Sequence, residues 1–150
     1  MAVVGVHKIE GLFKKAAGLR VDKSKVKELI SDVIDKKLYD LLLVGEMNAK
    51  YNDRDVIWFS DIPLTKAFRE SMDSFKELEE ELELKQILDH LATLPPLKYA
   101  LETELEKRLP EIAGTIIYVL AMITKEFSPK DKTVSSEDFK KAEKILDMTI

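Results

Sequence analysis

The side chains of this sequence that could do chemistry are mainly cations gathered near short loops. Three of them lie within residues 20–25, and two more flank Asp131 near the other end of the chain. Lysine and arginine clusters of this kind bind phosphate groups through charge and hydrogen bonds. The candidate phosphate contacts are Arg20, Lys23, Lys25, Lys130, Lys132, Lys14 and Lys15.

Catalytic and metal-binding arrangements are missing from the sequence. Cysteine is absent, which excludes thiol catalysis and cysteine-based zinc sites. His7 and His90 have no second histidine or carboxylate at metal-ligand spacing, and acidic pairs such as Asp32 and Asp35 fit solvated helix faces. The five glycines are scattered, so no loop that cradles phosphates is formed. We expect a protein that is not an enzyme and that uses no metal, cofactor or small-molecule substrate.

The composition fits one compact domain, residues 1–150, because 45% of the side chains are hydrophobic and can form a sizeable core. The net charge of −4 is divided unevenly. Residues 1–77 hold 14 basic and 13 acidic side chains, whereas residues 78–150 hold 10 and 15. Much of the acidic surplus lies in the run ELEEELE at 77–83, which we interpret as a solvated linker or, alternatively, as an acidic docking surface. The whole-chain charge argues weakly against nucleic acid but leaves room for a local basic patch.

No segment is long and apolar enough to predict a membrane span. The longest apolar run, residues 112–123, has twelve residues, whereas a spanning helix needs about 20. We expect this run to form a helix that is buried on nearly every side. No secretory signal is visible, so we expect a cytoplasmic protein without membrane contact. Few Asn and Gln and many Lys and Glu resemble thermophile usage.

Apolar residues recur at spacings of three and four, which predicts helices throughout. The first half is expected to form a short helix over 8–17, a long helix from a cap at Ser24 to about residue 52, and a third helix capped by Ser60 or Asp61. The second half repeats the plan with helices over 84–94, 98–127 and a last one capped by Ser135 or Ser136. Nothing between residues 73 and 94 breaks a helix, which leaves open one continuous helix through the acidic run.

Short, long and short helices joined by brief loops resemble the histone fold. The resemblance is most specific at RDVIWFSDIPLTKAF, residues 54–68, where an arginine, an extended pair and an acidic residue follow one another. In that family the arginine pairs with the aspartate seven residues on, so the resemblance implies that Arg54 and Asp61 clamp the loop to the following helix. In the second half Thr133 and Val134 match, but Asp131 stands in the place of the arginine.

The two-fold plan is also similar to a small family of bacterial and archaeal single-chain histone doublets. LFKKAAGLRVDK at 12–23 and KLYDLLLVGE at 37–46 carry this resemblance, with the segment 54–68. It implies an all-α chain in which two histone folds, residues 1–77 and 78–150, form a head-to-tail pseudodimer. Each half leaves apolar surface that only the other half can cover, which favours the same pairing.

Head-to-tail pairing would place residues 18–25 beside residues 128–133 and would gather the candidate cations at one end. Residues 52–56 and 93–99 would form the other, roughly neutral end. Two functions follow. One is weak, sequence-independent binding of double-stranded DNA, with a location at the nucleoid. The other is a protein-interaction module, docking another protein or a further copy of itself through the acidic run and the Trp58 region. The acidic pI of about 5.3 favours the second and the basic loops favour the first.

Overall fold

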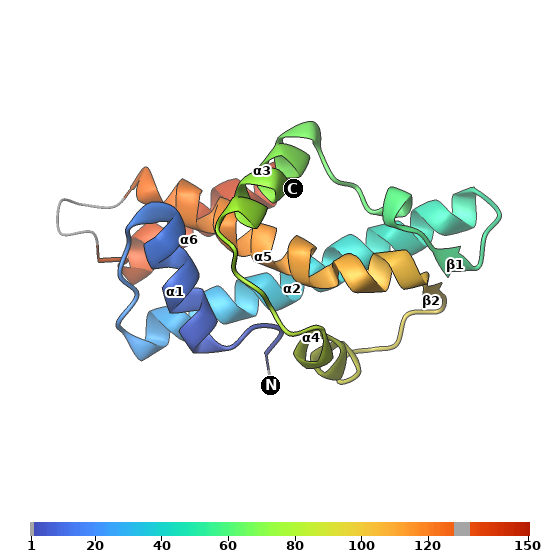
Figure 1. The fold of residues 1–150 in the computed structure, drawn as a ribbon, viewed down its shortest axis with the longest axis horizontal. Coiled ribbons are helices and arrows are strands. Elements are labelled where there is room, and N and C mark those ends of the chain that lie inside the picture. Colours follow the sequence, from blue (N-terminus) through green and yellow to red (C-terminus); the bar gives the residue numbers. More distant parts are fainter. Residues whose placement is uncertain (1, 128–132) are drawn as a thin grey trace.

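The computed structural model describes residues 2–127 and 133–150, and this part of the chain is almost entirely helical. The first half contains α1 (Val6–Ala17), α2 (Ser24–Tyr51) and α3 (Lys66–Glu77). The second half contains α4 (Leu84–Leu91), α5 (Thr103–Lys125) and α6 (Ser136–Thr149). The predicted all-α order of short, long and short helices, written twice, is confirmed. Figure 1 shows α2 and α5 as two long crossing rods, with α1 and α6 at one end of the molecule.

Two loop junctions join the halves head to tail. At one end, β1 (Val56–Ile57) pairs in parallel with β2 (Ala100–Leu101). At the other end, an isolated parallel bridge joins Arg20 to Thr133, and the amide of Val134 donates to the carbonyl oxygen of Arg20 at 3.0 Å. Each junction pairs the first loop of one half with the second loop of the other. The chain is therefore a pseudodimer of two histone folds.

Helix α5 is the spine of the core. It packs against each of the other five helices, and its middle turns are buried on nearly all sides, as the apolar run predicts. The hydroxyl groups of Thr115 and Thr124 are buried as well, and each donates to a backbone carbonyl four residues earlier at 2.7 Å. No helix in the described ranges combines the length and apolar character that crossing a membrane requires.

Some of the helix ends and caps that the sequence predicts are found in the structure, and others are not. Gly18 ends α1 in the left-handed conformation with φ of 68°, as its lack of a Cβ favours. Ser135 caps α6 and accepts a hydrogen bond from the amide of Asp138 at 3.1 Å. Ser24 is the first residue of α2 rather than its cap, so that prediction is wrong.

The third helix also begins later than predicted. Phe59–Asp61 form a short 3₁₀-helix, η1, and Thr65 caps α3 by accepting from the amide of Phe68 at 3.1 Å. The cause is Pro63, which disfavours a helical conformation at Ile62 and leaves it extended. Helix α3 does not continue into α4, because residues 78–83 form an acidic linker in which Glu79 has a positive φ of 56°.

Candidate nucleic-acid interface

The candidate site is the basic corner, defined here as residues 18–23 with the first turn of α2. Arg20, Lys23 and Lys25 all expose their side chains there. The bridge to Thr133 fixes the backbone of Arg20, so the second half positions a cation of the first half. Lys130 and Lys132, the other candidate phosphate contacts of this end, lie outside the described residues.

The N-terminus of α2 strengthens the positive potential of the basic corner. Its cap residue, Lys23, makes no side-chain capping hydrogen bond, and its first turn contains no acidic residue. The first amides of a 28-residue helix and its dipole therefore add to the charge of Lys25. The neighbouring α6 differs, because Ser135 caps it and Glu137 and Asp138 occupy its first turn. The phosphate-attracting features thus belong to the α2 side.

Two lysines of α1, unlike the cations of the basic corner, are paired with a carboxylate. Lys14 and Lys15 are both exposed, but the Nζ atom of Lys15 lies 3.3 Å from an oxygen of Glu80 in the acidic linker. Lys8 makes a second ion pair with the other oxygen of Glu80, also at 3.3 Å. Partial burial disfavours ionisation of Glu80, but the hydrogen bonds from the two lysines outweigh it and lower the pKa of this carboxyl. Helix α1 therefore offers phosphate fewer unpaired charges than its sequence suggests.

The opposite end of the molecule uses its arginine for structure. Arg54 donates from both terminal nitrogens to the two carboxylate oxygens of Asp61 at 2.6 Å, and its guanidinium lies 3.9 Å from the centre of the Trp58 ring. Glu46 accepts from the amides of Lys98 and Tyr99, at 2.6 and 3.1 Å. These contacts hold the two loops of that end together without presenting Arg54 to a ligand.

Asp61 is the buried partner of that pair, with 3% of its surface exposed. Its side chain also accepts a hydrogen bond from the amide of Trp58 at 2.7 Å, and its carbonyl oxygen accepts from the side-chain amide of Asn48 at 2.7 Å. The hydrogen bonds from Arg54 lower the pKa of Asp61 despite its burial, and the Trp58 amide adds to this effect. Asp61 therefore connects the residues on both sides of β1 through its carboxylate, and α2 through its backbone carbonyl.

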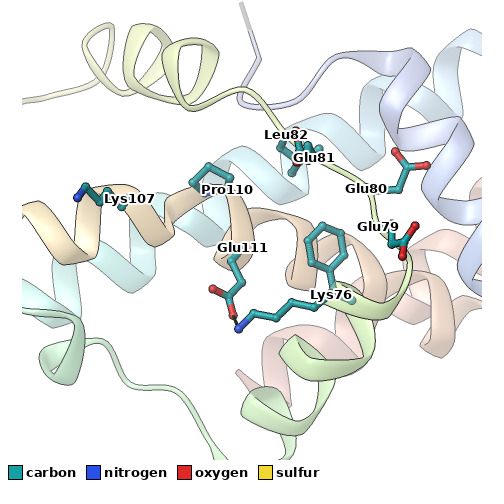
Figure 2. Close-up of a pocket in the computed structure, with 9 residues that line it drawn as sticks. Lys76, Glu79, Glu80, Glu81, Leu82, Lys107, Pro110 and Glu111 are labelled. Carbon is teal, nitrogen blue, oxygen red and sulfur yellow. Dashed lines mark ion pairs between the residues drawn. The ribbon is translucent and has the colours of Figure 1, made fainter.

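A cleft of about 680 Å³ lies between the acidic linker and α5 (Figure 2). Lys76 and Glu111 form an ion pair beside it with an N···O distance of 3.1 Å. The cleft brings together no nucleophile and base. Within residues 2–127 and 133–150, no three His, Asp or Glu side chains gather closely enough to hold a metal ion.

Sequence reasoning missed two contacts, one between the acidic linker and α1 and one at the opposite end of the molecule. Nothing in the sequence distinguishes Glu80 from the other acidic residues of its run. Lys8 and Lys15, however, are seven residues apart on one helix face, and this spacing could have suggested a shared anionic partner. Glu46 gives no sequence signal, because its partners are backbone amides more than fifty positions away.

Residues 9–147 match the family described as "Domain of unknown function (DUF1931)". The chain belongs to the DUF1931 family. The DUF1931 match covers both short-long-short halves, from within α1 to near the end of α6. An uncharacterized protein of Aquifex aeolicus (strain VF5) is 30% identical, over 92% of this chain and 87% of its own length.

Two solved structures superpose on this DUF1931 protein over most of its length. A protein from Thermus thermophilus superposes with a TM-score of 0.92 at 40% identity and covers 99% of both chains. The histone from Methanopyrus kandleri superposes with a TM-score of 0.65 at 15% identity, over 93% of this chain and 92% of its own. The second likeness shows a shared fold and no more, since the identity is low.

Proposed function

We propose that this chain is a single-chain histone doublet, not an enzyme, that binds duplex DNA weakly and without sequence preference. The observation that carries the proposal is the basic corner, where Arg20, Lys23 and Lys25 surround the uncapped N-terminus of α2. Side-chain cations and helix N-termini that face phosphates position a protein on DNA without reading its bases. Such a protein would act in the cytoplasm, at the nucleoid.

The charge distribution sets an upper limit on the affinity. DNA wrapping uses a continuous basic track, but Lys8 and Lys15 are paired with Glu80 and Arg54 is paired with Asp61. The chain as a whole carries a net charge of −4. We therefore expect a dissociation constant in the usual non-specific range, roughly 10⁻⁶ to 10⁻⁴ M.

Fluorescence anisotropy with a random-sequence duplex, at about 50 and about 200 mM salt, tests the proposal. A variant with Arg20→Ala, Lys23→Ala and Lys25→Ala should bind more weakly. The slope of its log affinity against log salt concentration should fall in magnitude by about one for each phosphate contact that is lost. The matched control removes three exposed lysines outside the basic corner: Lys50→Ala, Lys66→Ala and Lys98→Ala. Equal weakening in both variants would show that only net charge matters and would contradict the proposal.

A second candidate function is a protein-interaction module that does not bind DNA. The specific observation in its favour is a row of apolar side chains on α2, spaced four residues apart and turned to solvent. Leu43, Met47 and Tyr51 are 36%, 56% and 80% exposed. Absence of DNA binding at tens of micromolar protein in low salt would favour this candidate, with another protein or a second copy of the chain as partner.

A further inference from the structure

The acidic linker, residues 78–83, makes a specific contact with α1. Lys8 and Lys15 lie on one face of α1, two helical turns apart, and the Glu80 carboxylate accepts from both, one lysine on each oxygen at 3.3 Å. Both lysines are about half exposed. The carboxylate therefore occupies the place between two lysines that a phosphate group would otherwise take.

The packing of the linker determines which glutamate of the acidic run makes this contact. Leu78 and Leu82 pack against the hydrophobic core and anchor the linker on both sides of Glu80. The positive φ of Glu79 turns the backbone between these anchors. Glu79 and Glu81 remain exposed, whereas the Glu80 side chain is only 23% exposed and extends toward α1 (Figure 2). The contact thus depends on the packing of the linker and not on its overall charge alone.

The paired lysines lie on the helix that leads into the basic corner. Helix α1 ends at Ala17, and Arg20 lies three residues further along the chain, in the loop. A duplex on the basic corner that extended along α1 would meet Lys15 and then Lys8, each still paired with Glu80. Phosphate and the Glu80 carboxylate are both anionic acceptors for the same ammonium groups. Lys8 and Lys15 therefore cannot donate fully to both at once.

We infer that Glu80 is an intramolecular competitor of DNA that holds α1 in a partly neutralised state. This inference rests on the proposed DNA binding at the basic corner and adds a device that limits it. DNA contacts α1 fully only when the Glu80 carboxylate is displaced from Lys8 and Lys15. Removal of the Glu80 charge frees both lysines for phosphate and adds up to two contacts.

The test compares Glu80→Gln with Glu79→Gln and Glu81→Gln by anisotropy with the same duplex across a salt series. All three variants lose one negative charge from one linker, but only Glu80 contacts the α1 lysines. Glu80→Gln should tighten binding by about three- to tenfold. The slope of its log affinity against log salt concentration should increase in magnitude by up to about two, one for each lysine that is freed. The two control variants should change the dissociation constant by less than about twofold. Thermal melting checks that all variants are folded.

Each outcome has a distinct meaning. Binding by Glu80→Gln that exceeds both controls, including binding where the wild type shows none, supports the inference, and adding Lys8→Ala and Lys15→Ala should then remove the gain. If the wild type binds and Glu80→Gln behaves like Glu79→Gln, the inference is overturned while the proposed function stands. If no variant binds duplex at tens of micromolar in low salt, both are overturned.

Discussion

Arg54 and Asp61 face each other across the second loop of the first half, joined by two N···O contacts of 2.6 Å. The pair holds the start of β1 against η1, and Trp58 covers it from one side. A bidentate guanidinium–carboxylate pair is among the strongest charge-assisted hydrogen bonds in proteins. Its role in this chain is therefore to fix the loop that pairs with the second half.

Replacing Asp61 should weaken the fold more than replacing its exposed neighbour. Asp61→Asn removes the charge that accepts from Arg54 and Trp58 while keeping the size of the side chain. We expect the free energy of unfolding to fall by about 2 kcal/mol, the cost of losing hydrogen bonds to a charged, buried group. Urea denaturation measures it, with Asp55→Asn as the exposed control in the same loop. Equal stability of the two variants would contradict the role of the pair.

The same pair predicts how stability changes in acid. Hydrogen bonds from Arg54 lower the pKa of Asp61, so its folded value lies below the unfolded value of about 3.9. The stabilisation is fully present above the unfolded pKa and is lost as the pH falls through the folded pKa. The wild type should therefore lose more stability than Asp61→Asn below about pH 4. Denaturation curves measured from neutral to acidic pH check this, and parallel curves would refute it.

Asp35 should show the opposite dependence. Burial raises the pKa of this carboxyl, although the amide of Val3 donates to it at 2.8 Å and His90 lies 3.7 Å away. A raised folded pKa favours the protonated form, so its contribution to stability is full below the unfolded pKa and is lost as the pH rises through the folded pKa.

Asp35→Asn keeps an oxygen for the Val3 amide and removes the partly buried charge. We expect its melting temperature at neutral pH to exceed that of the wild type by about 2 °C, and the two proteins to converge in acid, where Asp35 is protonated. A lower melting temperature at neutral pH would mean that attraction to His90 outweighs burial.

Two glycines test how closely the helices pack. A Cβ at Gly114 of α5 would overlap with the Phe75 ring of α3, whereas a Cβ at Gly11 of α1 has no neighbour within 4 Å. Gly114→Ala should lower the free energy of unfolding by about 1–3 kcal/mol through overpacking. Gly11→Ala should raise the free energy of unfolding by about 0.5–1 kcal/mol, because alanine has a higher helix propensity than glycine at an exposed position. If Gly114→Ala were also stabilising, α3 would not lie against α5 as described.

The helical plan could be predicted from the sequence because it depends on local periodicity. Apolar spacing indicates the helices themselves, Gly18 correctly indicates the end of α1, and Ser135, one of the two predicted candidates, caps α6. The start of α3 was missed because two competing signals lie close together. Asp61 has the chemistry of a cap, but it accepts from the amide of Trp58, the residue that precedes η1, and Pro63 delays the helix so that Thr65 caps it.

The candidate site was less predictable, because its charges are decided by tertiary contacts. Lys14 and Lys15 are neighbours in sequence, yet Lys15 contacts Glu80, 65 positions away. Exposure of Arg20 follows from its loop, but its position relative to Thr133 requires the pairing of the two halves. Sequence patterns indicate which side chains carry charge, whereas folding decides which of these charges are already neutralised.

Amide chemical-shift mapping of the ¹⁵N-labelled protein with a random duplex in low salt tests the central claim most directly. If the basic corner binds phosphate, the amides of residues 18–26 and their neighbour Val134 should shift progressively with added DNA and return as salt is raised. Residues 43–58 at the opposite end should stay unchanged. Shifts confined to residues 43–58, or none at tens of micromolar protein and DNA, would contradict the claim.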